Sequence, residues 1–343
     1  MARSYPAHAK PLWQRVLLTR EMAMIALLVV VVLYSLRSVP NFGNPLTLPY
    51  LVLDTAPILL IALPMTLVIV TGEIDLSVAS VVGLSSVTLG VLTEAGFSVP
   101  AAATVSLAVG VLCGLLNGFL VAYVGLPSLA VTIGTLALYR GIAVGMLGTK
   151  AVTDFPERWT HLATARIGGS QFPVIVVPIV VLAAVFVVLL HFTPFGRGVY
   201  DIGLSADTAH FSGVPVARTK LTLFVLSGVV AAFAGVFFTL RYGSARGDNA
   251  TGMELQVVAA VLLGGVSIFG GRGALHGVVA GVLLIGVISS ALRLESVTVN
   301  VINIIIGALL VLSVISTSVV GWFVRRRQRP AKALPTAGRP SPA

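Results

Sequence analysis

Long apolar segments, separated by short polar or glycine-containing stretches, dominate this chain. A helix needs about 20 mostly apolar residues to cross the hydrocarbon core of a bilayer. About ten segments approach that length, and we expect membrane-spanning helices near residues 22–37, 50–70, 76–93, 101–123, 128–147, 173–192, 221–240, 255–269, 274–292 and 298–321. The eighth segment is the shortest, which predicts a re-entrant or broken helix.

The composition places the chain in a membrane. Its 343 residues are 57% hydrophobic and 10% charged, whereas soluble domains carry about 25% charged residues. Segments 174–190 and 299–315 are uniformly apolar, unlike barrel strands, in which apolar and polar residues alternate over about ten positions. These observations predict an all-α polytopic protein in the lipid bilayer, with one membrane domain over residues 22–321.

The net charge of +10 comes from the two ends of the chain. Residues 1–20 and 325–343 carry basic side chains and no acidic ones, while the body between them is neutral. A neutral body argues against a nucleic-acid partner. Cytoplasmic loops are enriched in Lys and Arg, so an even number of spans predicts both termini in the cytoplasm. The basic tails would cover residues 1–21 and 322–343, the latter disordered.

Two glycine-containing turns are expected between spans. The run 264–281 holds seven glycines but lacks the G-x-x-x-x-G-K-[ST] pattern of a nucleotide phosphate loop. We therefore interpret it as a tight turn beside a closely packed helix, with these structural residues: Gly264, Gly265, Gly270, Gly271 and Gly273.

The second turn is TGEIDLSV at residues 71–78, containing Gly72, Glu73 and Asp75. It lies either near a translocation path or at a solvated loop end where Asp75 and Ser77 cap the next helix, and the capping interpretation is favoured. Segments 71–90 and 264–286 share the pattern of a polar turn before a small-residue helix. Transporters often contain two related halves, and an internal repeat is one interpretation of this pattern.

The stretch between the sixth and seventh spans contains a candidate short helix at 205–212. Ser205 or Asp207 would cap its start and Gly213 would end it, between Pro194 and Pro215. Such a helix either docks into a groove on a cytosolic partner or is an ordinary connection.

Polar residues within the spans are candidates to line a path, because they can hydrogen-bond solute hydroxyl groups; they are Asn117, Thr132, Thr135, Asn300 and Asn303. Hydrogen bonding between helices is the alternative. Asp54 and Arg140 also lie in or near spans, where charges usually face protein or water.

Enzyme chemistry has little support in the sequence. The five histidines are scattered, Cys113 is the single cysteine, and no paired carboxylates or Ser-His-Asp set is evident. We expect neither a metal nor another cofactor.

Four segments together resemble the permease subunits of bacterial ABC importers for monosaccharides, the ribose, xylose, arabinose and galactose group. They are VIVTGEIDLSVASVVGLS (68–85), GLLNGFLVAYVGLPSLAVTIGTLALYRG (114–141), FGRGVYDIGLSADTAHFSGV (195–214) and ELQVVAAVLLGGVSIFGGRGALHGVVAG (254–281). The resemblance implies that the short cytoplasmic helix is a coupling helix on a separate ABC ATPase subunit. The residues concerned would be Ser205, Ala206, Asp207, Ala209, His210, Phe211, Ser212 and Gly213.

The resemblance also implies a second permease subunit, a separate sugar-binding protein outside, and a place in the cytoplasmic (inner) membrane. The chain departs from the family pattern at Glu73, where the family commonly has Gly, and at Ser205, where it commonly has Asn. A place in the rhamnose or autoinducer-sugar branch stays open. The alternative function is an ion-coupled secondary transporter or channel, which would need intramembrane carboxylates such as Asp54.

Overall fold

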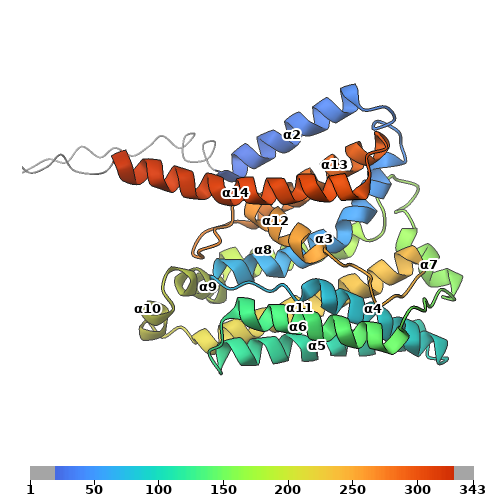
Figure 1. Cartoon of the computed structure of the whole chain (residues 1–343), viewed down its shortest axis with the longest axis horizontal. Coiled ribbons are helices and arrows are strands. Elements are labelled where there is room, and N and C mark those ends of the chain that lie inside the picture. Colours follow the sequence, from blue (N-terminus) through green and yellow to red (C-terminus); the bar gives the residue numbers. More distant parts are fainter. Residues whose placement is uncertain (1–19, 328–343) are drawn as a thin grey trace, which may run out of the picture.

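The computed structural model describes residues 20–327 and shows an all-α protein (Figure 1). Within that range the helices are α2 (Arg20–Ser38), α3 (Thr47–Val70), α4 (Val78–Glu94), α5 (Val99–Ala122), α6 (Ser128–Leu147), α7 (Glu157–Thr164), α8 (Val176–Phe192), α9 (Pro194–Leu204), α10 (Ala206–Phe211), α11 (Val216–Tyr242), α12 (Met253–Leu263), α13 (Leu275–Leu294) and α14 (Val299–Arg327). Two isolated β-bridges, at Val152–Ala245 and Arg166–Pro173, join loops.

Each of the ten expected spans corresponds to a helix. Six of these helices, in α2, α3, α5, α6, α11 and α13, are long and apolar enough to cross a membrane. The bent pair α8 and α9, with an angle of 68° between them, forms a further candidate span. Three apolar helices are shorter: α4, α12 and the Val299–Leu312 part of α14. The predicted short eighth span is α12, with 11 residues.

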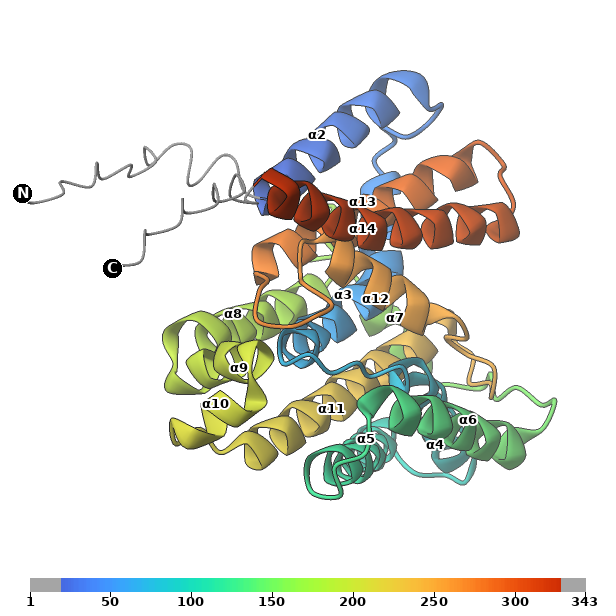
Figure 2. The same cartoon turned by 60° about the vertical axis from the view of Figure 1, so that its left-hand side comes forward.

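Helix α3 is the centre of the bundle. It is apolar around its whole circumference and buried almost throughout, as expected of a helix surrounded by others. It packs against α8, α11, α12 and α13. Helices α4, α5, α6 and α11 lie on one side of it, and α2, α12, α13 and α14 lie on the other (Figure 2).

Glycines allow helix backbones to touch at two crossings. A Cβ atom on Gly228 of α11 would lie 2.2 Å from the carbonyl oxygen of Gly110 in α5. A Cβ atom on Gly277 of α13 would lie 2.1 Å from the carbonyl oxygen of Gly264 after α12. Small residues at such crossings favour close packing in membranes. The turn that follows α12 therefore lies beside a closely packed helix.

The loops gather at two ends of the bundle. We call one the α10 end; it comprises residues 71–77, 193–215 and 264–274, which are joined by the contacts described below. The other, the α7 end, comprises residues 148–175 and the beginning of the α11–α12 loop, joined by the Val152–Ala245 bridge. Helix α14 continues to Arg327, past the predicted start of the C-terminal tail at 322. The remainder of both predicted tails lies outside the described residues.

Candidate coupling and translocation site

Helix α10 forms where the local sequence predicts it. The Ser205 hydroxyl accepts a hydrogen bond from the Thr208 N–H at 3.2 Å, which makes Ser205 the N-cap rather than Asp207. Gly213, with φ of 85°, follows the C-cap Ser212 and ends the helix. Ala209 is buried against the rest of the protein, whereas Asp207, His210 and Phe211 are exposed.

Exposed apolar side chains surround this short helix. Phe211 is 88% exposed, Leu204 at the end of α9 is 70% exposed, and Phe269 in the α12–α13 loop is 79% exposed. Basic side chains are exposed at the same end, among them Arg197, Arg218 and Arg272. An apolar and basic surface of this kind can receive another protein.

The turn between α3 and α4 is anchored by a buried carboxylate. Asp75 is 2% exposed. Its Oδ1 accepts from the Ser77 N–H at 3.0 Å and from the Ser77 hydroxyl at 2.6 Å, and its Oδ2 accepts from the Ser227 hydroxyl of α11 at 2.9 Å. The prediction of a solvated loop end is therefore wrong at Asp75. Ser77 is the N-cap residue of α4, at the position that the capping interpretation gives, but its side chain makes no capping hydrogen bond to the helix.

Three of the predicted path residues hold this turn or their own helix. The Asn117 Nδ2 donates to the Ser77 hydroxyl at 2.8 Å, and the Thr132 hydroxyl donates to the Ile74 carbonyl at 3.2 Å. Thr135 donates to the Val131 carbonyl within α6 at 3.0 Å. All three are buried. The polar groups of all three residues therefore have hydrogen-bond partners within the protein. For Asn117 and Thr132 these partners lie on another segment, which is the alternative interpretation given above.

The other two predicted path residues, Asn300 and Asn303, are exposed on the first turns of α14. Their shared face follows from their spacing of three residues. The structure does not bring them together with Asn117, Thr132 and Thr135, which belong to the helix group on the opposite side of α3. A role in a path stays a prediction for this pair.

Glu73 forms an ion pair that the sequence did not predict. Its carboxylate binds the Lys220 ammonium of α11, and both side chains are largely buried, with exposed fractions of 16% and 17%. The available signal was that both charges border apolar segments on the same expected side of the membrane. The residue that departs from the family pattern therefore ties the α3–α4 turn to the helix that follows α10.

The glycine loops meet each other at the α10 end. The Gly271 N–H donates to the Val70 carbonyl oxygen, the last residue of α3, at 2.8 Å. Gly72, Gly265, Gly270, Gly271 and Gly273 all have positive φ, a conformation that glycine adopts without a steric cost. The two turns that share a sequence pattern thus lie side by side. That they descend from an internal repeat stays a prediction.

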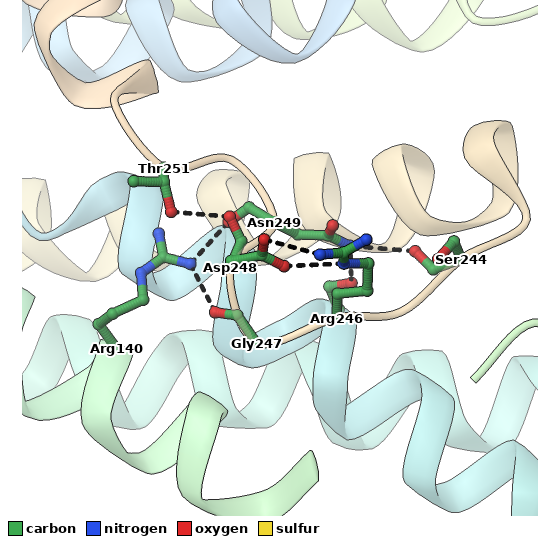
Figure 3. A network of polar contacts seen from close by, with 8 residues as sticks. Arg140, Ser244, Arg246, Gly247, Asp248, Asn249 and Thr251 are labelled. Carbon is green, nitrogen blue, oxygen red and sulfur yellow. Dashed lines mark hydrogen bonds and ion pairs between the residues drawn. The ribbon is translucent and has the colours of Figure 1, made fainter. Parts of the chain in front are cut away.

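The loop between α11 and α12 re-enters the bundle. The Arg140 guanidinium of α6 donates to the carbonyl oxygens of Gly247 at 2.8 Å and Asn249 at 2.7 Å (Figure 3). It also donates to the Ala79 carbonyl oxygen, near the start of α4, at 3.1 Å. Because α4 starts at the α10 end, this contact places the loop deep within the protein. The Asn249 side chain donates further to the Ser86 hydroxyl at 2.9 Å.

Part of this re-entrant loop is polar and open. Arg246 and Asp248 form a two-bond ion pair at 2.9 and 3.0 Å (Figure 3). Thr251 is also exposed. A polar loop that interrupts a membrane segment is typical of transporter pathways, and sequence reasoning had placed no path residue here.

Asp54 is compensated by two arginines in the last turns of α11 and α13. One carboxylate oxygen binds the guanidinium of Arg241, which is nearly buried. The other lies 2.9 Å from a guanidinium nitrogen of Arg293. A cavity of about 350 Å³ opens beside them, lined in part by Asn41, Asn44 and Tyr50. Because both carboxylate oxygens are engaged, Asp54 is not a free intramembrane acid.

Comparisons with known proteins agree with this architecture. Residues 47–314 match the family described as "Branched-chain amino acid transport system / permease component". The autoinducer 2 import system permease protein LsrD of Yersinia pseudotuberculosis serotype O:3 (strain YPIII) is 34% identical over 326 residues, covering 91% of this chain and 97% of that protein. The protein of the same name from Yersinia pestis (strain Pestoides F) has the same identity and coverage.

No solved structure matches this chain significantly. The family description and the names of the two relatives agree, because both describe a permease component of a transport system. The apolar helices of spanning length fit such a membrane-spanning subunit. The chain belongs to the transport-system permease family whose description is branched-chain amino acid transport system / permease component.

Proposed function

We propose that this chain is the membrane-spanning permease subunit of an ATP-driven ABC importer for a monosaccharide, and that α10 is its contact with a separate ATPase subunit. The observation that carries the proposal is α10 itself, a capped helix that projects from the bundle with Phe211 almost fully exposed. The polar side chains of α10 and its two caps are also exposed; they are Ser205, Asp207, His210 and Ser212.

The apolar surface at this end supports an ATPase partner. Leu204, Phe211 and Phe269 are exposed on three adjoining segments outside the long apolar helices. Large apolar side chains that face water usually mark an interaction surface. The two short segments before and after α10 lead directly into α9 and α11, so a partner that moves α10 acts on the membrane helices.

The orientation of the chain in the cytoplasmic membrane follows from its charges. Arg197, Arg218 and Arg272 are exposed at the α10 end, and Lys and Arg are enriched in cytoplasmic loops. We therefore place the α10 end and both termini in the cytoplasm, and the α7 end outside. A sugar-binding protein would then deliver solute to the α7 end.

For the translocation path we propose the re-entrant loop and the exposed face of α14. Arg246, Asp248 and Thr251 offer open polar groups within the bundle, and Asn300 and Asn303 add amides on α14. Hydroxylated solutes need such hydrogen-bonding groups when they leave water. A second permease subunit facing these elements would complete the path, in a homodimer or a heterodimer.

The substrate class rests on the resemblance to monosaccharide permeases and on the curated relatives, which are named for autoinducer 2 import. The family description names branched-chain amino acids, a different class of solute. We favour a monosaccharide because the relatives align over nearly their whole length. A binding screen of the partner binding protein against pentoses, hexoses, deoxy sugars, autoinducer 2 and leucine discriminates these classes.

Deletion of 206–212, or Gly213→Pro, tests the role of α10. The chain is expressed with its ATPase and binding protein, and co-purification of the ATPase and cellular uptake are measured. We expect both to be lost while the chain stays in the membrane. Gly43→Ala is the matched control, because a Cβ at Gly43 would make only an ordinary contact of 3.8 Å. Full uptake by the deletion variant would exclude α10 as the coupling element.

A further inference from the structure

Helix α9 touches the membrane helices at a point where no side chain fits. A Cβ atom on Gly203 would lie 1.9 Å from the Val70 carbonyl oxygen and 2.4 Å from the Gly271 nitrogen. Those two atoms are the acceptor and donor of the hydrogen bond that joins the end of α3 to the α12–α13 loop. The backbone of α9 therefore rests directly on that hydrogen bond.

Side chains are also excluded at the neighbouring glycines of this contact. A Cβ on Gly270 would lie 2.8 Å from the Gly203 oxygen and 3.0 Å from the Gly72 nitrogen. A Cβ on Gly271 would lie 2.7 Å from a methyl carbon of Leu204. Three segments that are far apart in the sequence thus meet backbone to backbone. We call this contact, made by Gly72, Gly203, Gly270 and Gly271, the glycine junction.

A second bond fixes α9 to the same loop. The Tyr200 hydroxyl donates to the Gly273 carbonyl oxygen at 2.7 Å. Tyr200 and Gly203 are three residues apart, so they lie on neighbouring parts of the α9 surface. Helix α9 therefore holds the α12–α13 loop at two points. One is the hydrogen bond from Tyr200 to Gly273, and the other is the close backbone contact at Gly203.

Helices α9 and α10 are joined without a flexible linker. Ser205 is at once the C-cap of α9, where its N–H donates to the Asp201 carbonyl at 3.0 Å, and the N-cap of α10. A displacement of α10 therefore moves α9. Close-packed contacts transmit such movements because they have little room to compress.

We infer that Gly203 and Tyr200 are positioning residues that transmit the movement of α10 to the α3–α4 turn and the α12–α13 loop together. The inference rests on the proposed role of α10 as the ATPase contact. Beyond the loop, α12 leads back to the re-entrant segment held by Arg140, so the movement reaches the polar loop inside the membrane domain.

The test is hydrogen–deuterium exchange of the assembled transporter, with its ATPase, in nanodiscs, without nucleotide and after trapping with ATP and vanadate. Four segments are followed: 70–77, 206–212, 251–258 and 264–274. In the unmodified protein, exchange should change with nucleotide in all four. Gly203→Ala should retain the change at 206–212 and ATP hydrolysis, but lose the changes in the other three segments.

Tyr200→Phe keeps the inference testable should Gly203→Ala fail to assemble, since it removes one hydroxyl group, keeps the ring and adds no atom to the glycine junction. We expect it to diminish the response of 264–274 alone. Gly43→Ala and the exposed Tyr123→Phe are the matched controls and should respond as the unmodified chain does.

The outcomes separate this inference from the proposed function. A response at 206–212, with normal responses of the other three segments in both Gly203→Ala and Tyr200→Phe, overturns the transmission role and leaves the ATPase contact in place. Absence of any response at 206–212 in the unmodified protein overturns the proposed role of α10, and the inference with it.

Discussion

Glu73 in the α3–α4 turn and Lys220 near the start of α11 form a largely buried ion pair. Lys220 lies a short distance after α10 in the chain, whereas α9, immediately before α10, contacts the same turn region through Gly203. The short exposed helix is therefore connected to the α3–α4 turn from both of its ends.

Breaking this ion pair should lower stability in a way that a charge exchange restores. Glu73→Gln and Lys220→Met each leave a partly desolvated charge without its partner. We expect each to cost at least about 1 kcal/mol, the upper value for exposed pairs, because the charge left behind is largely buried. Thermal unfolding of the chain in nanodiscs measures this, and the double variant Glu73→Lys, Lys220→Glu should recover part of the loss. No recovery would show that the two charges act independently.

Asn117 should matter for folding rather than for solute recognition. It is 1% exposed and donates to the Ser77 hydroxyl. Asn117→Ala removes its buried hydrogen bonds to Ser77 and Tyr139, each of which contributes about 0.5–1.5 kcal/mol to stability. The exposed Asn303→Ala is the comparison and should leave the unfolding temperature unchanged. An unchanged unfolding temperature for Asn117→Ala, with a changed solute preference, would return Asn117 to the path.

Gly228→Ala should separate α5 from α11. The added methyl group would lie 2.2 Å from the Gly110 oxygen, so the helices must move apart, at a cost of about 1–3 kcal/mol or more. The yield of folded protein and its thermal unfolding report the change. Gly134→Ala in α6 is the control, because nothing lies within 4 Å of its built Cβ. Equal yields for the two variants would contradict the close crossing.

Arg140→Lys should loosen the re-entrant loop although the charge is kept. A guanidinium reaches the Gly247, Asn249 and Ala79 carbonyls together, whereas an ammonium lacks the planar fork. We expect faster hydrogen exchange over residues 244–252 and reduced uptake. Arg37→Lys, at an exposed arginine in the last turn of α2 and outside this loop, is the matched control. Unchanged exchange in Arg140→Lys would mean that other contacts hold the loop.

Much of the helix content could be predicted because it depends on the length and composition of single segments. The ten expected spans correspond to ten helices, and α12 is short as expected. The α10 cap could also be predicted, since Ser205 and Gly213 act within one turn of that helix. Helices α7 and α9 were not predicted, because short helices of mixed polarity have no spanning pattern.

The site depended on contacts between distant segments. Asn117 and Ser77 are 40 residues apart, and Glu73 and Lys220 are 147 apart. No local sequence pattern indicates such pairs, so the sequence alone did not distinguish the buried polar residues Asn117, Thr132 and Thr135 from residues that line a path. The re-entrant loop was equally hidden, because its depth is set by Arg140 in α6 and not by its own composition.

The energy source of transport tests the central claim most directly. The chain is reconstituted into liposomes with its ATPase and binding protein, and uptake of the sugar selected in the binding screen is followed with ATP or with an imposed proton or sodium gradient. We predict uptake that requires ATP and the ATPase and is insensitive to ionophores. Gradient-driven uptake by the chain alone would contradict the account and favour an ion-coupled transporter.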